Sequence, residues 1–499
     1  MCVRRPYVVL GCIVSAVVSL IGVHVQAEKR QTQSIVGAEV KGLAPVSDEI
    51  LQVNLPRAEE ADLGNGLHLM VLEDRRVPVV SFQMILIGAG GYYDPPDHAG
   101  LASFTASLLR EGTETLSSVE IAEALEALAS RLTISTDMSL QATSMTGSSL
   151  TEHLEQTMVL AADVLLRPSF PEEELALFKD RERAGLMQQR TRPGFLAVER
   201  LAGAIYGNHP AGRTSPTPET LDKTTRDDLL TFHQAHYIPD HAVFAMAGDI
   251  SMVDARTLVE QYFGAWARTE TPRPTVQDPE PIGPSKVYLI NRAASVQTNL
   301  VVGTQAIKRT SQDYDVLTVM NQILGGGATG RLFMNLREDK GYTYGAYSSF
   351  TALRYRGDWE ASTEVRTEVT GDALAELLRE LKRIRDEAVP EQEFQDAKRS
   401  IIASFALSLE SPSTLLGNSV VRHLYDLTDD YWERYPERII SVTREQVQEV
   451  AMKYLDADRL HIVAVGDGER ISDVLTSFGP VDVYDDQGTL VTTVGNRWQ

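Results

Sequence analysis

Three histidines near the middle of the chain form a compact group of potential metal ligands. They are His233, His236 and His241, and two histidines three residues apart on a helix can share one metal ion. A similar junction between a helix and a strand recurs at residues 453–460, where there is no histidine. We therefore expect these three residues to be structural, and His98 to make local hydrogen bonds, rather than to bind a metal.

A second candidate site is the segment 97–113, which the spacing of its apolar-face residues predicts to be a helix. Those residues fall at i, i+3, i+4, i+7 and i+8, namely Leu101, Phe104, Thr105, Leu108 and Leu109. The opposite face carries Ser103, Ala106 and Ser107. Two hydroxyls and a methyl group cannot hold a catalytic dication, and no Ser/His/Asp arrangement can be argued from spacing alone.

This segment resembles the zinc-binding helix of the M16 (pitrilysin/insulinase-like) metallopeptidases. The family carries His-x-x-Glu-His between a Gly-Leu-Ala-like start and Gly-Thr, and this chain has Gly-Leu-Ala at 100–102 and Gly-Thr at 112–113. Ser103, Ala106 and Ser107 stand where the family has two zinc-binding histidines and a water-activating glutamate. The resemblance implies that the helix is kept and its metal site is lost.

The family's third zinc ligand is a glutamate on a later helix, seven residues after another acidic residue. The matching residues are Glu182 and, at the ligand position, Gln189. A neutral amide there is a fourth departure from the family's site. The resemblance therefore implies no catalytic residue and no metal in this chain.

The strongest positive match lies in the second half of the chain. Residues 324–333 read Leu-Gly-Gly-Gly-Ala-Thr-Gly-Arg-Leu-Phe, and no Gly-Lys-Ser/Thr follows, which disfavours a phosphate-binding loop. The block resembles the glycine-rich turn and helix of the M16 C-terminal half. In that family an arginine and a tyrosine seven residues later bind the substrate backbone, and the matching residues are Arg337 and Tyr344. The alternative is that Arg337 pairs with a local acid and Tyr344 packs in the core.

Two similar folded units are needed to position these residues. Strand-like runs occur at 79–87, 287–291 and 300–302. Between such runs lie amphipathic helices, of which residues 374–384 are a clear case. A helix end, turn, buried strand and Gly-Asp stop at 236–249 recur at 453–467, which indicates a duplication. We predict an α+β fold of two homologous lobes, each a mixed or antiparallel sheet packed with helices, and the resemblance implies a clam-like half.

Composition shifts suggest where the parts of the chain begin and end. Five prolines between Thr269 and Pro284 cannot continue a helix or a central strand, so they predict a linker. The predicted organisation is a signal peptide at 1–27, a leader or linker at 28–55, an N-terminal lobe at 56–268, a proline-rich linker at 269–285 and a C-terminal lobe at 286–499.

The first 27 residues predict export. Arg4 and Arg5 precede an apolar run, and Val-Gln-Ala at 25–27 is a small-residue cleavage pattern. A retained anchor and a lipoprotein at Cys12 are the alternatives. Cys2 and Cys12 are the only cysteines of the chain, so cleavage would leave no thiol for a disulfide, a metal or catalysis. We expect a periplasmic or secreted protein with no stable membrane span after cleavage.

The acidic charge excludes one class of partner. The chain has 47 Lys and Arg against 69 Asp and Glu, a net charge of −22 that becomes −24 once Arg4 and Arg5 are removed. Nucleic acid is disfavoured by such a surface, whereas a basic or unfolded peptide would be attracted to it. A purely solubilising role for the charge is the commoner meaning.

Bacterial M16 peptidases of this size often pair a zinc-bearing subunit with one that lacks zinc and supplies the arginine and tyrosine. The resemblance implies the second kind: a non-catalytic, substrate-binding subunit of a heterodimer, with zinc in an HxxEH-bearing partner and an extended peptide as substrate. Two alternatives stay open. One is a structural or peptide-binding pseudopeptidase without a role in proteolysis, and the other is an independent hydrolase with an unrecognised site.

Overall fold

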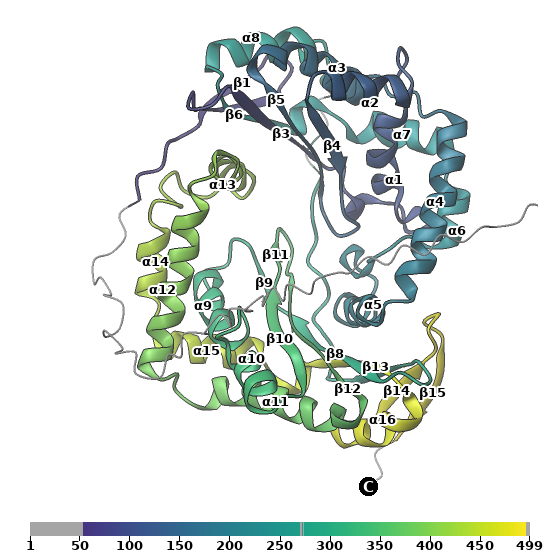
Figure 1. Cartoon of the computed structure of the whole chain (residues 1–499), viewed down its shortest axis with the longest axis vertical. Helices are drawn as coiled ribbons and strands as arrows, with labels where there is room; N and C mark the ends of the chain where they lie inside the picture. Colours follow the sequence, from purple (N-terminus) through teal and green to yellow (C-terminus); the bar gives the residue numbers. More distant parts are fainter. Residues whose placement is uncertain (1–52, 270–271, 273, 496–499) are drawn as a thin grey trace, which may run out of the picture. The chain divides into compact units, whose positions relative to one another are not determined.

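The computed structural model describes residues 53–269, 272 and 274–495 (Figure 1). All of them belong to one compact unit that starts at Ile50. The predicted signal peptide, and the predicted leader up to residue 52, lie outside the described residues. Among the described residues, no helix has the length and apolar character needed to cross a bilayer.

The first lobe is built on a six-stranded mixed sheet with the order β1-β2-β6-β3-β5-β4. Its strands are β1 (Glu59–Asp62), β2 (His68–Glu73), β3 (Val79–Ile87), β4 (Arg131–Ser135), β5 (Ala142–Leu150) and β6 (Ala242–Gly248). Strand β6 is buried along its whole length, because it is apolar throughout and has a neighbour on each side. It runs parallel to β2 and antiparallel to β3.

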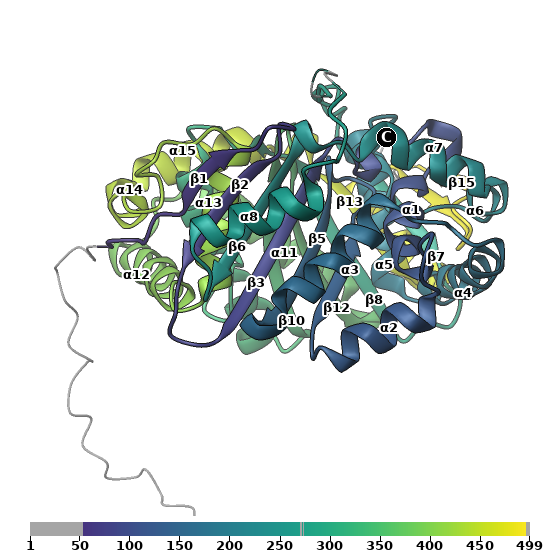
Figure 2. The same ribbon diagram turned by 90° about the horizontal axis from the view of Figure 1, so that it is seen from above.

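Helices cover one face of this sheet, and their apolar side chains form the first core with it. Figure 2 shows α3 and α8 crossing above its strands. The helices of this part of the chain are α1 (Leu101–Leu108), α2 (Ser118–Ala127), α3 (Leu154–Leu166), α4 (Glu172–Arg190), α5 (Pro193–Tyr206), α6 (Pro218–Lys223), α7 (Arg226–His236) and α8 (Met252–Phe263).

The second lobe is built on a seven-stranded mixed sheet with the order β10-β12-β8-β13-β7-β14-β15. Its strands are β7 (Val287–Asn291), β8 (Gln297–Gln305), β10 (Thr343–Phe350), β12 (Asp358–Arg366), β13 (His461–Gly466), β14 (Val481–Tyr484) and β15 (Leu490–Val494). Two short strands, β9 (Ile307–Lys308) and β11 (Ala352–Leu353), pair separately. The described residues between α8 and β7 contain no helix or strand.

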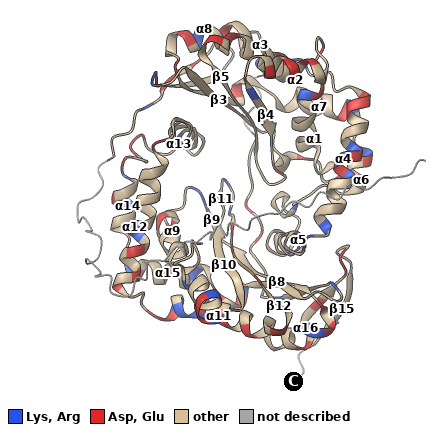
Figure 3. Cartoon of the chain, in the orientation of Figure 1, with Lys and Arg blue, Asp and Glu red and all other residues tan. Residues whose placement is uncertain are grey.

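The helices of this second part follow the same plan. They are α9 (Tyr314–Leu324), α10 (Arg331–Phe333), α11 (Thr370–Asp386), α12 (Glu391–Ser408), α13 (Pro412–Leu424), α14 (Tyr435–Ser441), α15 (Arg444–Tyr454) and α16 (Gly468–Leu475), with a π-helical turn, η7 (Met334–Asp339), after α10. Acidic and basic residues are interspersed along helices such as α4, α8 and α11, while the strands β3, β5, β6 and β8 carry none (Figure 3).

The two sheets repeat one pattern of pairing. In the first, β2 is parallel to β6, and β3, β5 and β4 follow antiparallel; in the second, β7 is parallel to β13, and β8, β12 and β10 follow antiparallel. The repeated blocks of sequence correspond to β6 and β13, the strands at the same place in each sheet. The predicted α+β fold of two similar lobes, each a sheet packed with helices, is confirmed.

Each lobe also contributes one helix that packs on the sheet of the other lobe, and α5 and α13 are called the lent helices below. Helix α5 packs on β7, β8 and β13 of the second sheet, where Leu201 is buried and Gly303 leaves room for its side chain. Helix α13 packs on β2 and β6 of the first sheet through Leu416 and Val420. The two contacts bury the sheet faces that the other helices of each lobe leave uncovered.

Candidate functional site

Helix α1, which corresponds to the M16 zinc helix, is shorter than predicted. The sequence predicts a helix over 97–113, whereas the α-helix covers Leu101–Leu108, with 3-10 turns before and after it. The helix cannot start earlier because Gly100 adopts a φ of 103°, which is not a right-handed helical conformation. Glycine is needed at this position, since a Cβ on Gly100 would lie 2.7 Å from Phe104 Cζ.

A buried carboxylate caps this helix. Asp94 Oδ2 accepts a hydrogen bond of 2.7 Å from the Gly100 amide, and Oδ1 accepts one of 2.8 Å from the Ala102 amide. Burial raises the pKa of Asp94 to about 6, although these two hydrogen bonds act to lower it. The capping residue lies seven positions before the first residue of the helix, so a search for a residue directly preceding it does not find this cap.

The sequence places the three replaced positions of α1 on the face opposite its apolar stripe, but they differ in exposure. Ser107 is exposed and Ser103 is half-buried, but Ala106 is only 1% exposed and belongs to the first core. The apolar stripe of this short helix is wider than its spacing suggests, because α4 and α7 pack on it as well as the sheet. The methyl group of Ala106 therefore serves packing.

The fourth replaced position, Gln189, lies in the last turn of α4 and is half-buried. Its carbonyl accepts a hydrogen bond of 2.9 Å from the Arg192 amide. Burial raises the pKa of Glu182, which lies seven residues earlier on α4. None of the residues at the α1 and α4 positions belongs to a group of three or more potential metal ligands among the described residues.

The histidines that sequence reasoning assigned to a structural role lie at the end of α7 and just after it. His233 Nε2 lies 2.7 Å from the Leu165 carbonyl oxygen, and His236 Nδ1 lies 2.7 Å from that of Gly88. Burial lowers the pKa of both rings. His241 is buried, and His98 pairs with Asp97 at 3.3 Å. These contacts tie the end of α3 and the residue after β3 to α7, and none of these histidines belongs to a group of three potential ligands among the described residues.

The glycines between α9 and α10 allow the turn that they form to lie close against strand β10. The Ser348 amide donates a hydrogen bond of 2.9 Å to the Gly325 carbonyl, and a Cβ on Gly325 would lie 2.5 Å from the Ser348 nitrogen. A Cβ on Gly330 would lie 2.9 Å from the Gly325 Cα. Side chains at these glycines would push the turn off the strand.

The segment that carries Arg337 is anchored by polar contacts that sequence reasoning missed. Arg331 forms a fork with Glu393 of α12, with distances of 2.7 and 2.9 Å. Asn335 donates a hydrogen bond of 2.7 Å to Glu380 of α11. Arg331 and Asn335 are four residues apart, about one turn of a helix, and that spacing is the signal by which they could have been found.

Arg337 and Tyr344 both point into solvent. The Arg337 side chain is 45% exposed, lies 3.6 Å from Glu338 and stacks on the Phe333 ring at 4.7 Å. Tyr344 is 89% exposed, so it does not pack in the core. Arg337 thus has a local acidic partner, Glu338, but this residue is exposed and the pair leaves the guanidinium accessible.

Tyr344 lies on β10, an outermost strand of the second sheet. The pairing of β10 with β12 shifts register between Thr343 and Ala346, which places a bulge at Tyr344. The glycine-rich turn covers the strand edge at Ser348, toward the other end. A bulge at a sheet edge re-aims a side chain, here that of an exposed tyrosine next to the turn that carries Arg337.

Two family models match the chain in succession. One, described as insulinase (peptidase family M16), matches residues 69–219, and the other, described as the peptidase M16 inactive domain, matches residues 223–401. Named relatives match most of the chain as well. A Bacillus subtilis protein named uncharacterized zinc protease YmxG is 26% identical over 359 residues, which are 71% of this chain and 85% of that protein. A Helicobacter pylori protein named non-peptidase homolog YmxG is 24% identical over 360 residues, which are 71% of this chain and 82% of that protein.

Solved structures share the fold. The peptidase M16 inactive domain from Pseudomonas fluorescens has a TM-score of 0.77 at 27% identity, covering 82% of this chain and 98% of that one. A protease from Helicobacter pylori has a TM-score of 0.76 at 18% identity, covering 83% of this chain and 100% of that one, which is a likeness of fold. The two family matches and the two similar sheets agree with each other. The chain belongs to the M16 peptidase family, with an insulinase-type domain followed by an inactive-type domain.

Proposed function

We propose that this chain is the non-catalytic, substrate-binding subunit of an exported M16-type zinc peptidase. Its partner would be a related chain that carries His-x-x-Glu-His and the zinc ion. The observation that carries this proposal is the contrast between α1, where Ser103, Ala106 and Ser107 offer no metal ligand, and β10, where Tyr344 is exposed beside the turn that carries Arg337.

Arg337 and Tyr344 suit an extended peptide backbone. A guanidinium presents several fixed N–H donors and a phenol presents one O–H donor, and both can hydrogen-bond peptide carbonyl oxygens. Such bonds strengthen as a carbonyl oxygen gains negative charge during peptide cleavage. The outer strand β10 offers a place for an extended peptide to add as a further strand.

The names of the relatives differ on peptidase activity. The name of the Helicobacter pylori relative, non-peptidase homolog, agrees with the proposal, while that of the Bacillus subtilis relative, zinc protease, belongs to a protein whose own site residues decide its activity. The net charge of −22 favours basic or unfolded peptides as substrates.

The test starts from a tagged copy of this chain purified from its native cells. We expect a second M16 chain to co-purify, the pair to cleave an unstructured basic reporter peptide, and the zinc needed for that cleavage to remain with the second chain after separation. Cleavage by this chain alone, in the presence of a chelator, would show an independent hydrolase and contradict the proposal.

The two proposed binding residues are then changed within the pair. Arg337→Ala and Tyr344→Phe should each lower kcat/KM by about 100-fold, because each removes a donor aimed at a charged intermediate. Arg379→Ala is the matched control, since Arg379 is an exposed cation of the same lobe that pairs with Glu376. Full activity of both variants would favour a structural pseudopeptidase.

A further inference from the structure

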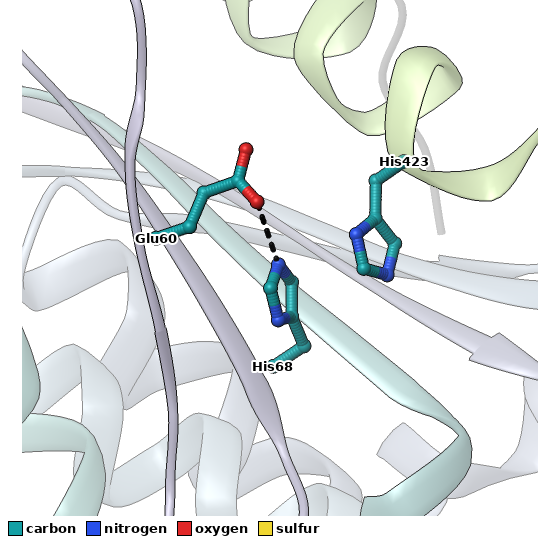
Figure 4. A group of neighbouring side chains, drawn as sticks. All are labelled: Glu60, His68 and His423. Atoms are coloured by element: carbon teal, nitrogen blue, oxygen red, sulfur yellow. Dashed lines mark ion pairs between the residues drawn. The ribbon is translucent and has the colours of Figure 1, made fainter. Parts of the chain in front are cut away.

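Among the described residues, one group has the composition of a metal site, and it lies far along the sequence from α1 and α4. It consists of Glu60 of β1, His68 of β2 and His423 of α13, whose ligand atoms lie within 4.8 Å of one another. Figure 4 shows the two strands presenting Glu60 and His68 toward His423 on the helix. The group therefore joins the first sheet to a helix contributed by the second lobe.

Strand register brings the first two residues to one face. Glu60 pairs with Met70 across the antiparallel β1 and β2, and Asp62 pairs with His68. Residues directly opposite each other point to the same face, and so do residues two apart on one strand. Met70 packs in the cluster formed with α13, so Glu60, Asp62 and His68 share the face that α13 covers.

Helical spacing brings the third residue to that face. Leu416 and Val420 of α13 are buried against the first sheet, and His423 follows Val420 by three residues and Leu416 by seven. These positions fall on one side of a helix. The His423 ring is half-buried and stacks on the His68 ring, with centroids 4.0 Å apart and planes inclined by 19°.

The hydrogen bonding of His68 orients it as a ligand. His68 Nδ1 lies 2.8 Å from Asp62 Oδ1, so Nδ1 carries the proton that this contact shares. His68 Nε2 is buried without a hydrogen bond and lies 3.3 Å from Glu60 Oε2. In the neutral ring, a nitrogen lone pair then faces a carboxylate oxygen, an arrangement that needs a positive charge between the two atoms.

Arg422 of α13 does not supply that charge at the same atom. It pairs with Oε1 of Glu60 and, at 2.7 Å, with Asp429, while the Oε2 atom faces His68. In metal sites, the imidazole nitrogen that does not bind the metal usually donates a hydrogen bond to a carboxylate or carbonyl, which orients the ring. Asp62 has that position relative to His68.

We propose that Glu60, His68 and His423 bind a divalent transition-metal ion, with Zn²⁺ as the natural candidate. Two imidazoles and one carboxylate, with a water molecule at the fourth position, form a common zinc coordination set. Zinc–nitrogen bonds of about 2.0 to 2.1 Å require the ligand atoms to approach to about 3.4 Å, so binding would require the His423 side chain to rotate out of the stacked arrangement. The ion would fasten α13 to the first sheet.

This proposal is separate from the proposed function. The sequence predicts no metal anywhere in this chain, so this proposal departs from that prediction, at a place away from α1 and α4, where the family binds its catalytic zinc. The site at α13 needs no partner chain and no peptidase activity, so it can fail or hold independently of the role given to Arg337 and Tyr344.

The test is a zinc titration of the purified, processed chain, monitored by competition with a chromophoric chelator. We expect one Zn²⁺ per chain with a submicromolar Kd, and a visible Co²⁺ spectrum of a four-coordinate site. His68→Gln and His423→Gln should each weaken binding at least 100-fold. His153→Gln is the control, because His153 also lies beside a glutamate, Glu152 at 3.9 Å, and should leave the affinity within twofold.

Two further measurements keep the outcome clear. Zn²⁺ should raise the Tm of the wild-type chain and not that of His423→Gln, and circular dichroism checks that each variant is folded. Glu60→Gln, at a more exposed position, should also weaken binding. No binding at 100 µM Zn²⁺, or equal binding in the double histidine variant, would overturn the proposal.

Discussion

The two lobes share a sheet topology but differ in what they expose. In the first lobe the helix at the family's zinc position packs into the core, and Ala106 on it is buried there. In the second lobe Tyr344 projects almost fully into solvent from an edge strand. Packing explains the first arrangement and does not explain the second, because an exposed aromatic ring contributes little to folding. The comparison shows that one sheet topology buries Ala106 in the first lobe and presents an exposed tyrosine on an edge strand in the second.

The lobes differ inside their cores as well. The strands β6 and β13 occupy the same place in the two sheets. When the two strands are aligned on their final glycines, Val243 is the residue equivalent to His461. Val243 is fully buried among apolar residues, and His461 is 3% exposed with neither ring nitrogen in a hydrogen bond. Both face the helix lent by the other lobe, so the second lobe tolerates a polar group where the first has none.

The largest expected effect concerns the lent helices. Leu201→Ala in α5, at a side chain that is 1% exposed, should lower the free energy of unfolding by about 2 to 5 kcal/mol, since it opens a cavity against the second sheet. Urea unfolding measures the change. Val198→Ala, on the same helix and 43% exposed, should cost under about 1 kcal/mol. Equal losses in the two variants would mean that α5 is not a core element of the second lobe.

The start of α1 should be the next most sensitive position. Gly100→Ala places a Cβ at a φ of 103° and within 2.8 Å of Pro216 Cβ, so we expect a loss of about 1 to 3 kcal/mol in unfolding free energy. Gly203→Ala provides the contrast, because Gly203 lies in the middle of α5 with open space around its Cα. It should stabilise the chain by about 0.5 to 1 kcal/mol. A neutral Gly100→Ala would show that α1 can begin elsewhere.

The buried histidine predicts a dependence of stability on pH. Burial lowers the pKa of His461 to about 4, whereas an unfolded histidine titrates near 6.5. As the pH falls from 6.5 toward 4, the unfolded chain takes up a proton that the folded chain does not, so stability is lost over that range. His461→Val, which copies the first lobe, should remove this loss, worth about 2 kcal/mol at pH 5.

Thermal or urea unfolding of the two proteins at pH 7 and pH 5 measures the effect. The informative quantity is the change in their stability difference between the two pH values, because the smaller valine also leaves a cavity whose cost is the same at both. Parallel pH profiles would show that His461 is not the residue that makes acid destabilising.

The smallest effect is expected on α1. Ser103→Ala and Ser107→Ala should change unfolding free energy by less than about 0.5 kcal/mol, because one residue is exposed and the other half-buried. They should also leave the activity of the purified pair within twofold. A large loss of activity in either variant would show that the helix has kept a role in chemistry after all.

Much of the fold follows from local pattern. The predicted strands 79–87 and 287–291 coincide with β3 and β7, and the helix predicted around 374–384 lies in α11, because alternating or helical apolar spacing is a direct consequence of burial on one face. The length of α1 and the burial of Ala106 were not predictable in this way. They depend on the φ of Gly100 and on neighbours packed from α4 and α7, which are not visible in a short window of sequence.

The site residues divide in the same manner. Arg337 and Tyr344 could be assigned by resemblance, and their exposure became known from the structure. Glu60, His68 and His423 could not be found by spacing, because two of them lie on neighbouring strands and the third comes more than 300 residues later on a helix lent by the other lobe. Only strand register and the packing of α13 bring them together.

The exchange of α5 and α13 also affects how the chain matures. One apolar face of the first sheet stays open until residues 412–424 have been synthesised, since α13 is the helix that closes it. A growing chain therefore cannot finish its first lobe early, and both lobes must close late and together.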